Sequence, residues 1–159
     1  MTPFRHSLLL ACLLGLLAPA ASAQDAASAQ DAAAAWAPAT GDAVVDVRLA
    51  DINRYAARYP EAFIDELVRY FDAPRPLLQD LLGRQERKPG DLYYACALAR
   101  VSGRPCRGVI EAWAAGHADG WQGIARDLGV APGGARAKRL REGVAESYRR
   151  WGRPLPDGG

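Results

Sequence analysis

One histidine beside an aspartate has the residue types and spacing that acid–base chemistry needs. His117 and Asp119 lie in a short glycine-bounded segment, and His117 is the only histidine beyond residue 23. A histidine next to a carboxylate can exchange a proton with a substrate, but we identify no nucleophile nearby. Such a segment is more often a solvated polar turn. We therefore assign no catalytic residue and keep an unrecognised hydrolase that uses His117 and Asp119 as an alternative.

Cys96 and Cys106 are the two cysteines that remain beyond residue 23. An even pair in a chain sent to an oxidising compartment is the setting in which a disulfide forms, so we predict one between them. The alternative is two buried thiols that act as small apolar residues. A single histidine without cysteines or carboxylates at ligand spacing gives no zinc site, so we expect neither a metal nor a cofactor.

Four basic residues near the start of the last predicted helix form a candidate binding face: Arg136, Lys138, Arg139 and Arg141. The stretch near residues 121–150 also has a helix-turn-helix pattern, with a short apolar helix, a glycine turn and a basic second helix. The basic side chains can meet phosphates, but no Asn, Gln or Ser stands where base edges would be read. DNA binding is thus the alternative function if the N-terminus is not an export signal; otherwise we do not expect nucleic acid as a partner.

Residues 1–23 have the three parts of a secretory signal peptide. Arg5 and His6 make the start positive, residues 7–18 form an apolar core, and residues 21–23 offer small side chains for cleavage. The core is shorter than the roughly 20 residues that a membrane-spanning helix needs. An uncleaved anchor and a lipoprotein box at residues 9–12 are the alternatives. We predict a periplasmic or secreted protein whose mature chain has no transmembrane segment.

The rest of the sequence divides into a spacer, one domain and a tail. Residues 24–41 are rich in Ala, Gln, Asp and Ser, with almost nothing large to bury, and are predicted to be disordered. Residues 42–154 repeat apolar side chains at three- and four-residue steps and show no β-alternation. They predict a single all-α domain of six or seven short helices in an irregular orthogonal array, with the helix-turn-helix-like corner near its end. Asp91 is placed to cap one of these helices, and residues 155–159 form a flexible tail.

Acidic and basic residues are unevenly distributed along this domain. The formal net charge of the whole chain is only +2, so the overall charge gives no argument for nucleic acid or an anionic membrane as partner. Acids prevail between residues 42 and 72 and bases from residue 121 onward. We expect ion pairs between these two parts within the fold; the alternative is that the basic part steers an anionic partner.

Three tryptophans, Trp113, Trp121 and Trp151, fall on apolar faces of predicted helices. Their helical periodicity predicts core anchors, and the alternative is an aromatic groove for a peptide or a glycan.

The segments "ALARVSGRPCRGVIEAW", "GWQGIARDLGVAPGG" and "RLREG" resemble a group of exported bacterial proteins of uncharacterised function. The group's pattern is Gly-Trp-Gly-x-Ile-Ala-x-x-Leu-Gly-x-x-Pro-Gly-Ser, and the resemblance covers roughly residues 42–154. Gln122 replaces a glycine of the pattern, Gly134 a serine, and Ala137-Lys138 a Phe-His pair. The resemblance implies an exported helical domain and brings no activity. The sequence thus favours a small non-enzymatic exported domain that binds an unknown protein or envelope component.

Overall fold

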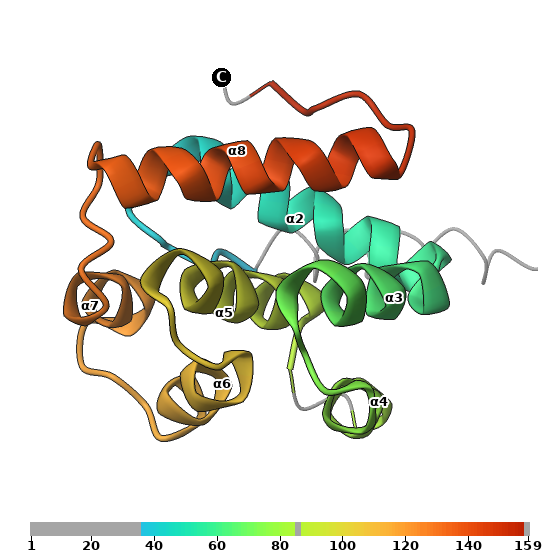
Figure 1. Cartoon of the computed structure of the whole chain (residues 1–159), viewed down its shortest axis with the longest axis horizontal. Coiled ribbons are helices and arrows are strands. Elements are labelled where there is room, and N and C mark those ends of the chain that lie inside the picture. The colour runs from blue at the N-terminus through green and yellow to red at the C-terminus, as the bar shows by residue number, and fades with distance from the viewer. Residues whose placement is uncertain (1–35, 85–86, 158–159) are drawn as a thin grey trace, which may run out of the picture. The chain divides into compact units, whose positions relative to one another are not determined.

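The computed structural model describes residues 36–84 and 87–157, and within them the chain forms seven helices and no strand (Figure 1). The predicted all-α class and number of helices are confirmed. The predicted signal peptide and most of the predicted spacer lie outside the described residues. No helix in the described part is both long and apolar enough to cross a bilayer. The helices are α2 (Ala43–Arg58), α3 (Pro60–Phe71), α4 (Arg75–Gly83), α5 (Pro89–Ser102), α6 (Cys106–Ala114), α7 (Gly120–Asp127) and α8 (Ala135–Arg150).

Helix α5 is the central element of the fold. It packs against α2, α3, α6 and α8, and every residue from 90 to 99 is buried. Figure 1 shows α8 and α2 on one side of α5, with α6 and α4 on the other. Residues 92–99 include no charged side chain, as expected for a helix that its neighbours cover all round.

The packed domain includes Trp36, which lies before the predicted boundary at residue 42. The Trp36 ring packs against the core, and its Nε1 donates a hydrogen bond to Asp91 Oδ2 at 3.3 Å. Thr40 is buried, and its hydroxyl donates to Asp46 Oδ1 at 2.6 Å. Residues 36–41 thus belong to the fold rather than to a disordered spacer. At the other end Leu155, placed in the predicted tail, packs partly buried against the core.

The sequence predicts that Asp91 caps this helix, but in the structure Asp91 lies within α5 and does not cap it. The N-cap is Lys88, because Pro89 can occupy the first helical position without losing a hydrogen bond. The buried Asp91 carboxylate instead accepts the indole N–H groups of Trp121, at 2.9 Å, and of Trp36. Burial raises the pKa of this carboxyl, while the two indole donors oppose the rise. Asp91 therefore fastens the segment before α2 to the core.

We expect Trp36→Phe to lower the free energy of unfolding by about 1 kcal/mol, because one oxygen of the buried Asp91 loses its donor. Trp36→Ala should cost more, about 2 kcal/mol, since a partly buried ring is also lost. Chemical denaturation of the purified variants measures both changes. Unchanged stability in both would mean that this segment adds nothing to the fold.

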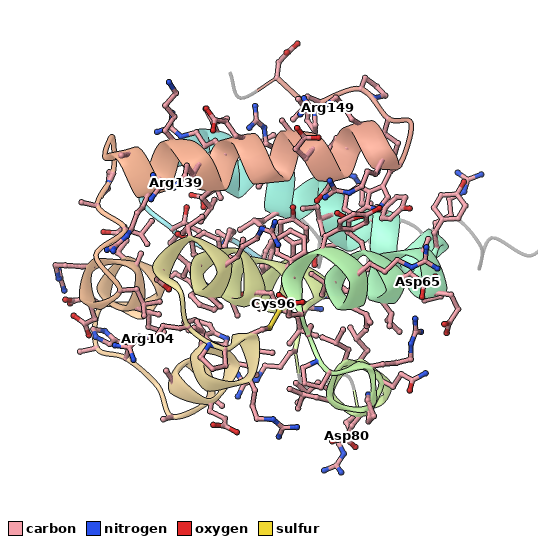
Figure 2. All side chains as sticks on the ribbon, viewed as in Figure 1. Asp65, Asp80, Cys96, Arg104, Arg139 and Arg149 are labelled. Atoms are coloured by element: carbon pink, nitrogen blue, oxygen red, sulfur yellow. A yellow bond between two sulfur atoms is a disulfide. The ribbon has the colours of Figure 1, made fainter. Side chains whose placement is uncertain are left out.

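Cys96 of α5 and Cys106 of α6 lie at disulfide distance, with their Cα atoms 4.5 Å apart, and Figure 2 shows the bridge between the two helices. Both residues are buried. Helix α5 ends at Ser102 and is capped by Gly103, whose φ of 72° is in the left-handed region that favours glycine. The sharp turn that follows brings the start of α6 back against α5.

The tryptophans take the predicted packing roles. Trp121 is buried, and Trp113 stacks on it with ring centroids 4.1 Å apart. Trp151, directly after α8, packs partly buried against the core.

The acidic and basic parts of the domain attract each other within the fold, as predicted. Arginines from the C-terminal part reach carboxylates at or near α2 and α3, which ties the last helix to the first two. The pairs are Arg141–Asp42, Arg153–Asp51 and Arg150–Glu66.

Glu66 is the most deeply buried acid of these pairs. Its Oε1 accepts hydrogen bonds from Ser147 Oγ at 2.6 Å and from Arg150 Nε at 3.0 Å. The Tyr93 hydroxyl lies 2.7 Å from Ser147 Oγ. The network joins α3, α5 and α8, and in it the buried charge has both a counter-charge and hydrogen bonds.

Candidate ligand-binding groove

His117 lies shortly before α7 and does not pair with the Asp119 carboxylate. Its Nδ1 accepts the backbone N–H of Asp119 at 3.1 Å, so the neutral ring carries its proton on Nε2. That Nε2 lies 3.1 Å from Asp127 Oδ2, to which it donates. The Asp119 carboxylate pairs with Arg126. The structure thus joins His117 and Asp119 only through the backbone, and both ring nitrogens already have partners.

The His117 ring rests on Gly123 of α7, where a Cβ would lie 2.0 Å from His117 Cε1. We expect Gly123→Ala alone to cost about 2 kcal/mol, because the ring must leave its site. In a His117→Ala background the same change should stabilise by up to about 1 kcal/mol, since Ala favours a helix more than Gly does. Denaturation of the four proteins gives both values. The same effect in both backgrounds would show that the two residues do not interact.

Two of the four residues of the predicted basic face are used inside the domain. Arg136 Nη1 donates to the carbonyl oxygens of Leu128, at 3.3 Å, and Gly129, at 3.4 Å, where α7 ends. Arg141 pairs with Asp42 as described above. Lys138 and Arg139 are exposed and form no ion pair with any described residue; Figure 2 labels Arg139 on α8.

The predicted corner between α7 and α8 is present as a packing arrangement. In Figure 1, α7 is seen nearly end-on while α8 lies across the view, so the two helices cross steeply. Residues 128–134 connect them, a longer link than the roughly 3–4 residues of a helix-turn-helix. Ala137, Leu140 and Val144 of α8 are buried in the core.

A groove of about 570 Å³ lies between α2, the start of α3 and the segment after α8. Its lining combines three arginines with three aromatic rings and a single acid. With three arginines and one acid, the lining of the groove has a formal net charge of +2. The lining residues are Asp51, Arg54, Tyr55, Arg58, Tyr59, Ala62, Trp151 and Arg153.

Asp51 positions two of the three arginines. Its buried carboxylate accepts the Tyr148 hydroxyl at 2.8 Å and lies 3.0 Å from Arg54 Nη2 and 3.2 Å from Arg153 Nη1. Arg54 and Arg153 come from opposite ends of the domain and meet at this one acid. Both guanidinium groups are thereby brought to the groove.

The aromatic rings form a continuous series along the groove. Tyr55 stacks on Trp151 with centroids 4.2 Å apart, and Tyr59 lies 5.3 Å from Tyr55. Tyr55 is buried, whereas Tyr59 is 47% exposed. Burial raises the pKa of the Tyr55 hydroxyl.

Arg58 is the groove's cation that forms no ion pair with any described residue. Its Cζ lies 5.6 Å from the centroid of the Tyr59 ring, a cation–π distance. The sequence "RYAARY" repeats Arg-Tyr four residues apart, which places both pairs on one face of α2 and at its end. This repeat is the sequence signal that could have predicted half of the residues that line the groove.

Comparisons with protein-family models, curated proteins and solved structures gave no match for this chain. No group of three or more potential metal ligands occurs among residues 36–84 and 87–157. We therefore interpret the groove from its own chemistry.

Proposed function

We propose that the protein is an exported, non-enzymatic binding domain that takes up an anionic envelope component or protein at this groove. The observation that carries the proposal is the set of three arginines beside exposed and stacked aromatic rings. Arginine suits the recognition of carboxylates and phosphates, and Arg, Tyr and Trp are enriched among the residues that contribute most to binding at protein interfaces. The N-terminal signal pattern and the resemblance described above support export.

The groove suits an anionic partner better than the basic face on α8. Arg54 and Arg153 are held at the groove by Asp51, and Arg58 has no competing acid. On α8, Arg136 and Arg141 already donate to groups of the domain. Only Lys138 and Arg139 remain there, and Phe71, the aromatic residue that lines a pocket together with Arg139, is buried.

Co-sedimentation with the envelope fraction of the producing cell tests the proposal. Arg54→Gln/Arg58→Gln should reduce the bound fraction about tenfold, because two charge-assisted contacts are lost. The matched control, Lys138→Gln/Arg139→Gln, removes the same charge from α8 and should bind as the unmodified protein does. Loss of binding in the control alone would move the site to α8, and binding unaffected by either pair would refute both sites.

Intact-mass measurement of the exported protein tests the second part of the proposal, which is export. The mature chain is expected to begin at Gln24, directly after the predicted cleavage site. A full-length chain recovered only from the cytosol would refute export.

A further inference from the structure

The groove is open to solvent on one side. Asp51 and Tyr55 at its floor are buried, whereas Arg54, Arg58 and Tyr59 on its rim are exposed. A ligand lying there is covered by protein on one face only. The outer face of the ligand must therefore be compatible with water. An apolar outer face would stay exposed to water and would gain no free energy from burial.

Tyr59 is the most exposed aromatic ring of this groove. Tyr55 and Trp151 are stacked on each other, while nearly half of Tyr59 is exposed. A sugar ring has an apolar C–H face that can lie on an aromatic ring and hydroxyl groups that stay in water. A flat aromatic ligand stacked on Tyr59 would instead leave its second face bare.

Arg58 sets the charge of the ligand. Its guanidinium lies over the Tyr59 ring, whereas those of Arg54 and Arg153 are partly neutralised by Asp51. An anionic group bound by Arg58 must therefore be carried on, or directly next to, the ring that stacks on Tyr59. A carboxylate matches the planar guanidinium by accepting two parallel hydrogen bonds.

We propose that the groove binds a carboxylated sugar of an acidic glycan, with the ring on Tyr59 and the carboxylate on Arg58. This inference rests on the proposed binding function and narrows it to one ligand class. Ion pairing in an open groove is screened by salt, so the affinity should fall as ionic strength rises.

Titration of the whole mature protein with trigalacturonate tests the proposal, followed by calorimetry and by the indole N–H signal of Trp151 at the groove wall. Arg58→Gln should raise the Kd about tenfold. Lys138→Gln, which removes an equal charge on α8, should leave the Kd unchanged. Tyr59→Phe should keep the affinity because the ring remains, and Tyr59→Ser should weaken it several-fold. The methyl ester of the same trisaccharide, which lacks the charge, should bind as weakly as Arg58→Gln binds the acid.

Each contrary outcome has a defined meaning. Equal affinity for the acid and its methyl ester overturns the role of Arg58. Tighter binding of hexathymidylate than of trigalacturonate overturns the glycan in favour of single-stranded nucleic acid. If trigalacturonate fails to bind but envelope binding still depends on Arg54 and Arg58, the ligand class is wrong and the proposed function stands. If both fail, the proposed function falls as well.

Discussion

Arg150→Met should lower the free energy of unfolding by about 3 kcal/mol, because it leaves the Glu66 carboxylate buried without its counter-charge. The Glu66 side chain is 3% exposed and that of Arg150 is 27% exposed, so water screens the pair only from one side. We therefore place the effect at the lower end of the range for broken buried pairs. Ser147 still donates to Glu66 in the variant, but it brings no charge.

Two further variants separate charge burial from helix effects in the denaturation measurement. Arg149→Met, one residue away, removes an arginine whose partner Glu146 is exposed, and should change stability by less than about 0.5 kcal/mol. Arg150→Met/Glu66→Gln removes both charges and should recover most of the loss. If Arg150→Met costs no more than Arg149→Met, the buried pair does not stabilise the fold.

Gly90→Ala should also destabilise the domain by about 3 kcal/mol, the cost of forcing an added methyl into a closely packed interior. A Cβ on Gly90 would lie 2.6 Å from Trp36 Cη2 and 2.9 Å from the carbonyl oxygen of Leu49. The second atom belongs to the backbone of α2, so relief requires α2 and α5 to move apart. The close approach of these two helices depends on a residue with no side chain.

Gly143→Ala is the matched control for that substitution. Gly143 lies inside α8, and a Cβ there would meet nothing within 4 Å. The change should stabilise by up to about 1 kcal/mol, the difference in helix propensity between Ala and Gly. Thermal or urea unfolding of both variants shows whether each substitution raises or lowers the stability of the domain. A stabilising Gly90→Ala would disprove the close contact between α2 and α5.

Local patterns predicted those features that depend on near neighbours in the sequence. Apolar spacing predicted the helical class, because each helix turns one side to the core. The uneven distribution of charge predicted that opposite ends of the domain would pair, and Arg141–Asp42 is one such pair. The cysteine pair was predicted from number and expected compartment, and the turn after Gly103 brings the two residues together.

Trp36 and the groove were missed for a common physical reason. Trp36 is an isolated large residue after a low-complexity stretch, and its partner Asp91 lies 55 residues away in the sequence. In the groove, Arg54 and Arg58 share a readable spacing, but Trp151 and Arg153 come from the far end of the domain. No local sequence pattern predicts contacts of this kind, because they form only when the whole chain packs.

The groove has one wall from the first helix of the domain and one from the residues that follow the last. Arg153 follows Asp51 by 102 residues, so this pair can form only after that stretch of the chain has been synthesised. A nascent chain from which residue 153 has not yet emerged therefore has an incomplete groove, and a protease that cleaves after Arg150 would remove Trp151 and Arg153 from the lining. The groove is therefore complete only once the whole helical domain has been synthesised.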